Sequence, residues 1–244
     1  MRRVFLAYTL MKLFDAISSK LYERKEMTDA YVRSLDIFNP DKAKPVNIIG
    51  CGSIGSFAAL TLAKMGVQSF HLWDADSVGE ENIGCQNFGW EHLGKLKVDA
   101  VKEILIANSP VKPENVTCHP EFVKFETRLP RIITIVGVDS MAARQLIWHK
   151  LKNKVPLIVD GRIGGQVVRV FSVLPTEEYA EYYEKYFVKD EDAYQLPCTQ
   201  RNVAYVANIV QAIIGRAVRN FVEAGRVEKE IGIDMATFVN YSKE

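Results

Sequence analysis

The chain has 244 residues, of which 48% are hydrophobic and 25% charged, and its formal net charge is +1. This balance excludes a disordered or fibrous chain and gives no sign of a nucleic-acid or membrane surface, so we expect neither partner. No apolar run reaches the roughly 18 residues of a transmembrane helix. The four cysteines are scattered without a C-x-x-C pair, which predicts reduced thiols, a cytoplasmic protein and no zinc.

The first part of the chain predicts helices followed by a strand–helix–strand unit. Apolar residues recur at helical spacing near the start, so residues 1–44 are expected to form a helical N-terminal extension that leads to a turn at Asn39-Pro40-Asp41. Residues 46–49 are a short apolar run that predicts the first strand. Residues 54–65 have helical periodicity and end before Gly66, and residues 69–73 predict the second strand.

The same alternation continues through the middle of the chain. We expect a helix over 96–107, strands over 116–118 and 131–138, a helix over 140–153 and a strand over 157–160. Strands that alternate with helices through short connections indicate a parallel sheet. The predicted fold class is therefore α/β, with a Rossmann-like, doubly wound, mostly parallel sheet and helices on both faces.

The last third predicts one more strand and two helices. Residues 166–174 indicate a strand paired antiparallel, residues 176–197 a helix leading into a loop, and residues 202–221 a long packing helix. We expect a single domain made of a helical extension, an α/β core and a C-terminal part with a loop and a long helix, at residues 1–44, 45–175 and 176–244.

A glycine-rich turn joins the first predicted strand to the following helix. Gly50, Gly52 and Gly55 form a G-x-G-x-x-G pattern that also includes Ser53 and Ile54. The first glycine permits a tight turn, the second allows close approach of a ligand, and the third lets helix and strand pack closely. The helix N-terminus attracts negative charge. This pattern predicts that a nucleotide phosphate binds here.

A carboxylate at the tip of the second predicted strand completes the pattern. Asp74 can accept hydrogen bonds from ribose hydroxyls at this place. The glycine turn and Asp74 by themselves fit an NAD(P)-dependent oxidoreductase as well as an ATP enzyme, so both remain candidates at this point.

The next segment distinguishes the two candidates. It reads D-x-D-x-V, then a turn with Asn and Gln, then G-x-x-K before a helix, formed by Asp74, Asp76, Val78, Asn82, Gln86, Gly94 and Lys97. This pattern resembles that of the ThiF/MoeB-type adenylyltransferases of the ubiquitin-activating superfamily. The resemblance continues in Asp139-Ser140 and Arg144 after the fourth predicted strand, and in Arg33 upstream. It covers roughly residues 31–215.

These residue types also suit adenylation chemically. Lys97 can neutralise phosphate oxygens, Asp139 can hold Mg²⁺ together with substrate phosphates, and Arg33 and Arg144 can clamp the outer phosphates. A hydride-transfer enzyme does not need this set. Each residue also has a purely structural alternative: Lys97 as a surface lysine, Asp139 as a helix N-cap, and Arg144 as an ion-pair partner.

The resemblance implies a reaction and a partner. The chain would use ATP and Mg²⁺ to activate a carboxylate as an acyl-adenylate with release of pyrophosphate. The carboxylate would be the C-terminal glycine of a small ubiquitin-like or sulfur-carrier protein, or that of a peptide. The resemblance also implies a homodimer in which Arg33 reaches across the interface.

Two cysteines bear on how far the resemblance holds. Cys85 stands where the family has an arginine before the glutamine, which leaves open a non-catalytic nucleotide-binding subunit, and Arg162 is a candidate substitute for the missing charge. Cys198 matches the family's crossover-loop cysteine, which can accept the activated acyl group. Its alternative role is a small apolar residue beneath the loop.

Overall fold

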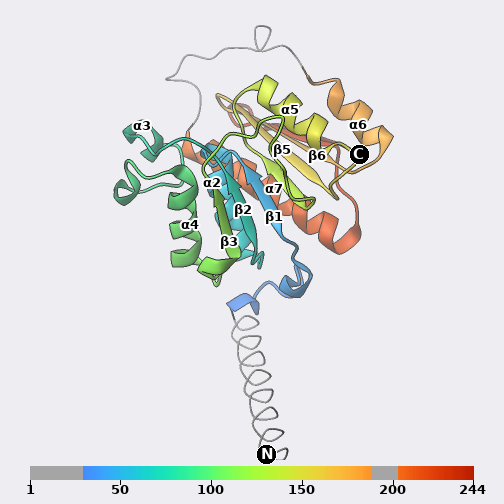
Figure 1. Ribbon diagram of the computed structural model, residues 1–244. Coiled ribbons are helices and arrows are strands. Elements are labelled where there is room, and N and C mark those ends of the chain that lie inside the picture. Colours follow the sequence, from blue (N-terminus) through green and yellow to red (C-terminus); the bar gives the residue numbers. More distant parts are fainter. Residues whose placement is uncertain (1–29, 188–202) are drawn as a thin grey trace, which may run out of the picture.

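The computed structural model describes residues 30–187 and 203–244, which form one eight-stranded sheet with helices on both faces (Figure 1). The strands are β1 Val46–Ile49, β2 Phe70–Trp73, β3 Val116–His119, β4 Ile133–Val136, β5 Ile158–Gly164, β6 Val167–Val173, β7 Glu230–Asp234 and β8 Val239–Lys243. The helices are α2 Ser53–Lys64, α3 Glu80–Ile83, α4 Lys97–Asn108, α5 Met141–Leu151, α6 Glu177–Glu184 and α7 Ala204–Ala224. Short 3₁₀ helices cover Pro40–Lys42, Trp90–His92 and Pro113–Asn115.

The sheet has a parallel half and an antiparallel half. Its strand order is β3-β2-β1-β4-β5-β6-β7-β8, and β1 to β5 are parallel to one another. Strands β6, β7 and β8 continue the sheet as antiparallel neighbours. The order reverses between β1 and β4, and ligands of doubly wound sheets bind beyond the carboxyl ends of the strands at such a point. The predicted α/β fold class is thus confirmed.

Two apolar layers hold the helices to the sheet. The larger layer joins the sheet to α2, α4 and α7, and includes Ile48, Leu72 and Ile214, each fully buried. The smaller layer lies on the other face and joins the sheet to α5 and α6 through Trp148, Tyr183 and other residues. Burial of continuous apolar strands on both faces is what a parallel sheet requires. None of the described helices is long and apolar enough to cross a membrane.

The C-terminal hairpin of β7 and β8 is an element that the sequence did not predict. All five residues of β8 are exposed, so the strand buries no apolar face that would stabilise it. It forms because the edge of β7 offers hydrogen-bond partners over the register Glu230↔Lys243 to Asp234↔Val239. Tertiary pairing, rather than local propensity, therefore decides this strand.

Other boundaries differ more modestly. The predicted strand 131–138 is shorter, at Ile133–Val136, because the residues beyond Val136 turn over the glycine loop. Residues 1–29 lie outside the described part of the chain. Within the described part of this extension, residues 30 and 31 are helical and residues 32–38 are turns or irregular backbone, so the helical expectation is wrong for 32–38. The turn expected at Asn39-Pro40-Asp41 coincides with the 3₁₀ helix Pro40–Lys42.

Candidate functional site

The glycine loop between β1 and α2 is shaped by contacts that only glycine allows. Gly50 has φ +88°, and a Cβ there would lie 2.7 Å from the carbonyl oxygen of Gly137. A Cβ on Gly55 would lie 1.8 Å from the carbonyl oxygen of Gly50. A Cβ on Gly52 would meet nothing closer than the Gln86 amide, at 3.8 Å. The outer two glycines therefore close the turn, and Gly52 leaves space beside it.

Asp74 fastens this loop to the end of β2. Its Oδ2 accepts a hydrogen bond from the backbone N–H of Cys51 at 2.7 Å, and its Oδ1 accepts one from Asp76 at 2.9 Å. The residue is 7% exposed, and burial raises the pKa of its carboxyl group. Each oxygen retains a second lone pair, so the carboxylate can still accept hydrogen bonds from a ribose.

Lys97 brings a positive charge to the same place. Its side chain is 10% exposed at the first turn of α4, and its Nζ lies 2.9 Å from Oδ2 of Asp76, which is 52% exposed. The backbone N–H of Lys97 also donates to the carbonyl of Asp76. The ammonium group favours the charged form of Asp74 and so partly offsets the effect of burial on its pKa.

The turn around α3 lies beside the glycine loop. Asn82 holds this turn together, because its Oδ1 accepts a hydrogen bond from Gly79 at 3.0 Å. Gln86 follows, and its Oε1 is buried without a hydrogen-bond partner beside Gly52. Cys85 is half-buried next to Ser53; burial raises the pKa of its thiol, and the hydrogen bond with Ser53 opposes this. The structure thus brings these predicted residues together.

Asp139 and Ser140 follow β4 and differ in what they do. Ser140 is the N-cap of α5, with its Oγ accepting a hydrogen bond from Ala143 at 3.2 Å. Asp139 is therefore not the cap; it is exposed and makes no hydrogen bond or ion pair within the described residues. No group of three or more His, Cys, Asp or Glu residues in the described part is placed to hold a metal ion.

Arg144 and Arg162 both form ion pairs with the buried carboxylate of Asp160. Arg144 is 6% exposed and donates to Asp160, to the carbonyl of Val138 and, at 3.2 Å, to that of Gly161. Arg162 donates its Nε hydrogen to Asp160 at 2.7 Å. In the structure Arg144 therefore forms the structural ion pair that was its alternative role. Contact of Arg144 with a phosphate stays a prediction, and that contact would require the ion pair with Asp160 to open.

Arg33 is not brought to this site within one chain. Arg33 is exposed in a turn next to Tyr31, whose hydroxyl donates to the carbonyl of Ala63 near the far end of α2. That helix has 12 residues, so about 18 Å separates its ends. Figure 1 shows this segment, in blue, beside the amino end of β1. Cys198 lies outside the described residues.

Sequence reasoning missed two residues that shape the site. Gly137 lets the glycine loop approach β4, since its own Cβ position lies 3.1 Å from Ile54. Asp160 is fully buried and anchors both arginines. A glycine directly after β4 and a carboxylate within the apolar strand β5 were the available signals, because both are unusual in buried parallel strands.

A glycine loop, a strand-end carboxylate and a buried lysine at the switch point of a doubly wound sheet define a nucleotide-binding α/β domain. The sequence pattern of the ThiF family matches residues 42–232, and the chain belongs to that family. Membership supports ATP-dependent adenylation chemistry in general and accounts for the sequence resemblance described above.

Several relatives and solved structures are similar to the chain. It is 29% identical to tRNA threonylcarbamoyladenosine dehydratase of Escherichia coli (strain K12) over 128 residues, 49% of this chain and 47% of that protein. The chain thus spans about half the length of this curated relative. The structure of PaaA has a TM-score of 0.69 and 20% identity, covering 96% of this chain and 82% of PaaA. E. coli MccB solved with MccA has a TM-score of 0.67 and 18% identity, covering 88% and 71%. These structures show the shared fold.

Proposed function

We propose that the chain is an adenylyltransferase that uses ATP to activate a carboxylate as an acyl-adenylate and releases pyrophosphate. The observation that carries the proposal is the convergence of the glycine loop, Gln86, Lys97 and Asp139 at one edge of the sheet, although they lie far apart in the sequence. Family membership supports the same class of chemistry.

The residues at the glycine loop fit ATP. Gly52 leaves room for phosphate oxygens at the N-terminus of α2, where backbone N–H groups attract negative charge. Lys97 supplies a cation beside this space. Gln86 Oε1 is an acceptor that lacks a partner next to Gly52, as expected where a ligand group completes the hydrogen bonding. Asp74 would hold the ribose.

Asp139 fits Mg²⁺, which binds one or two carboxylates together with substrate phosphates. The ion, when bound, would reduce the negative charge on the phosphates. Asp139 stands at the carboxyl end of β4, adjacent to the glycine loop through Gly137, and no neighbour among the described residues occupies its carboxylate.

In the proposed reaction a carboxylate oxygen attacks the α-phosphorus of ATP, and the bond to the bridging oxygen of the β-phosphate breaks. Pyrophosphate leaves and the acyl-adenylate remains. The chain contributes position and charge, which dominate catalysis of phosphoryl-type transfer. Cys85 supplies no charge to the leaving group, so that charge comes from Lys97 and from Arg33 of a second copy in a homodimer.

The proposed substrate is the C-terminal glycine of a small ubiquitin-like or sulfur-carrier protein, or the end of a peptide. Structures of E. coli MccB contain MccA in one case and ATP in another, which supports this class of substrate in a protein of the same fold. Cys198 would accept the activated acyl group in a later step. The variant Cys198→Ser is then expected to form adenylate but not to pass the acyl group on.

The first test compares the thermal stability of the purified chain with Mg-ATP, with ATP plus chelator and with NAD(H). A ligand at about 100 times its dissociation constant adds roughly 2.7 kcal/mol to the free energy of unfolding. We expect stabilisation by Mg-ATP that the chelator weakens. Stabilisation by NAD(H) and none by ATP would refute the proposal in favour of an oxidoreductase.

A second test separates an enzyme from a non-catalytic binding subunit. With a glycine-terminated peptide library as carboxylate source, the wild-type chain should release pyrophosphate from Mg-ATP, and Asp139→Asn should lose this release while keeping its fold. Nucleotide binding without release of pyrophosphate from any carboxylate would support the non-catalytic alternative.

A further inference from the structure

A second group of charged side chains lies on the face of the antiparallel strands that α6 covers. Arg162 of β5 and Arg169 of β6 are direct partners in the ladder, so their side chains leave the sheet on the same face. Both guanidinium groups lie over the ring of Phe171, with Cζ at 4.5 and 5.0 Å from its centroid. Like charges directly opposite each other destabilise a sheet unless something compensates them.

The compensation within the chain is incomplete. Asp160 pairs with Arg144 and Arg162, and Glu230 pairs with Arg169 at 2.6 Å. Three guanidinium groups and two carboxylates leave one positive charge in this network. The remaining hydrogen bonds to the two carboxylates come from neutral phenols, those of Tyr182, Tyr183 and Tyr241.

Arg162 also has a donor without a partner. Its Nε hydrogen goes to Asp160 and its Nη1 donates to the carbonyl of Tyr186 at 3.0 Å. Its Nη2 is buried and makes no hydrogen bond. A buried unpaired donor is costly, and each one in a native structure calls for an explanation. An anionic ligand would supply both the missing acceptor and the missing negative charge.

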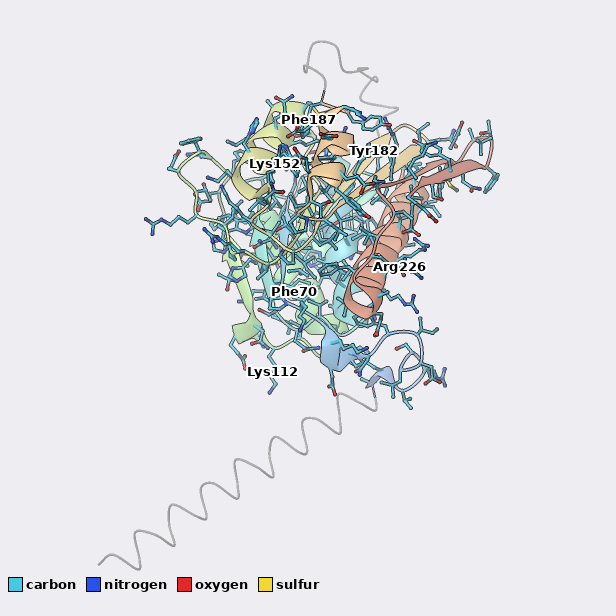
Figure 2. The ribbon with its side chains drawn as sticks, turned by 90° about the vertical axis from the view of Figure 1, so that its right-hand side faces the viewer. Phe70, Lys112, Lys152, Tyr182, Phe187 and Arg226 are labelled. Atoms are coloured by element: carbon cyan, nitrogen blue, oxygen red, sulfur yellow. The ribbon has the colours of Figure 1, made fainter. Side chains whose placement is uncertain are left out.

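The network lies at the same edge of the sheet as the nucleotide site. Asp160 pairs with Val136, the last residue of β4, so Arg162 lies past the carboxyl end of β4, as Asp139 does. Adjacent strands are about 4.8 Å apart. Arg144 links the two segments through the carbonyls of Val138 and Gly161. Figure 2 shows Tyr182 and Phe187, which flank this network, near the top of the molecule and well above Phe70, the first residue of β2.

We propose that Arg162, backed by Arg144 and Arg169, is the subsite that receives the carboxylate of the acyl substrate and positions it for attack on ATP. This inference rests on the adenylyltransferase function proposed above. A guanidinium group binds a carboxylate best through two parallel N–H donors. A carboxylate that displaces the Tyr186 carbonyl gains Nη1 and Nη2 together. Arg162 is thus a residue that determines substrate class, and neutral ends, such as amides, are excluded.

The test uses N-acetylglycine as the carboxylate probe, N-acetylglycinamide as its neutral counterpart, and inorganic phosphate, all at equal ionic strength and without nucleotide. We expect N-acetylglycine to raise the thermal midpoint of the full-length wild-type chain, and the amide not to. In Arg162→Gln the apparent affinity for the carboxylate should fall at least about tenfold, because a charge-assisted hydrogen bond is lost. Arg162→Lys, which keeps the charge but not the fork, should be intermediate.

The matched control is Arg216→Gln, which removes one arginine charge on α7, where Arg216 is half-exposed and paired with Glu228. It should respond to N-acetylglycine as the wild type does. The subsite is refuted if the wild type shows no response to the carboxylate, or if Arg162→Gln responds equally. It is also refuted if phosphate gives the larger response that depends on Arg162, because Arg162 would then belong to the nucleotide phosphates.

A parallel measurement with Mg-ATP keeps the two proposals apart. Arg162→Gln should still be stabilised by Mg-ATP, since the glycine loop and Lys97 are intact. If the wild type itself is not stabilised by Mg-ATP, the proposed function is wrong. A response to N-acetylglycine that depends on Arg162 would then show a carboxylate-binding site without a role in attack on ATP.

Discussion

Lys97 is the residue whose surroundings say most about its role. Its ammonium group is largely shielded from water, whereas its partner Asp76 is half-exposed. Loss of the lysine would leave only a half-exposed carboxylate, which water can solvate, so we expect the pair to contribute no more than about 1 kcal/mol to stability. A charge that the fold itself needs so little suits a group that neutralises phosphate oxygens.

The variant Lys97→Met tests this role. Affinity for Mg-ATP should fall by about tenfold or more because a charge-assisted hydrogen bond to phosphate is lost, and isothermal titration calorimetry measures it. The free energy of unfolding should change by no more than about 1 kcal/mol. Lys95→Met is the control, because Lys95 is more exposed and pairs with Glu103. Equal loss of affinity in both variants would contradict the role.

At the scale of elements, the glycine loop and α2 offer a contrast between two glycines. A methyl group on Gly55 would overlap the Gly50 carbonyl, whereas one on Gly52 meets only the Gln86 side chain at van der Waals distance. Gly55 is thus needed for the fold, whereas Gly52 keeps space open beside the glycine loop.

We expect Gly55→Ala to destabilise the chain by several kcal/mol, about 3 or more, because a clash with buried backbone cannot relax. Gly52→Ala should keep stability within about 1 kcal/mol but weaken Mg-ATP binding, since its methyl group fills the phosphate space. Urea unfolding and nucleotide titration on both variants measure the two effects. Full nucleotide affinity in Gly52→Ala would show that phosphates do not approach there.

The hairpin of β7 and β8 depends on a buried carboxylate. Glu230 is 1% exposed and accepts hydrogen bonds from Arg169, Tyr182 and Tyr241. Burial raises the pKa of Glu230, but these hydrogen bonds outweigh it, so the pKa lies below its usual value. A lowered pKa means stability that is present above the unfolded pKa and is lost as pH falls through the folded one.

Glu230→Gln should therefore lower the free energy of unfolding by about 2 kcal/mol at pH 7. The difference from wild type should shrink as pH falls below about 4.3, the ordinary glutamate value. Urea unfolding at pH 7, 5 and 3.5 measures it. Glu228→Gln is the control, because its partner Arg216 is half-exposed and the pair contributes less. A difference that is independent of pH would contradict this assignment.

For the whole molecule, the position of Arg33 raises the question of assembly. The segment that carries it is fixed near the far end of α2, so its own glycine loop is out of reach. A functional Arg33 thus requires a second copy of the chain, which is the proposed homodimer.

Mixing two inactive variants tests this arrangement. Arg33→Ala and Asp139→Ala should each lose pyrophosphate release. The two variants are unfolded and refolded together in equal amounts, so that subunits pair at random. About half of the dimers are then heterodimers, each with one intact site, which makes about a quarter of all sites intact. Activity should recover to that level, with sedimentation confirming the dimer. No recovery from well-folded dimers would mean that Arg33 does not act across the interface.

Much of the fold followed from the sequence because local and long-range signals agreed. The strands 46–49 and 69–73 and the helix 54–65 are matched within two residues by β1, β2 and α2, since buried parallel strands are continuously apolar and glycines mark the turns. Within the candidate site, the pattern from Asp74 to Lys97 selected residues that the structure places together. Arg144 and Arg162 could not be placed, because a one-dimensional pattern does not reveal which carboxylate a buried arginine meets.

The sequence by itself determined the α/β class, the glycine loop and the polar residues beside it, because these depend on residue type and near-neighbour spacing. Tertiary structure alone decided the exposed strand β8, which exists only because β7 offers an edge. It alone also decided that Arg162 faces Arg169 across a ladder and that Asp160 holds two guanidinium groups. The physical reason is that strand pairing and burial join residues far apart in the chain, and the resulting charge balance belongs to the assembled sheet.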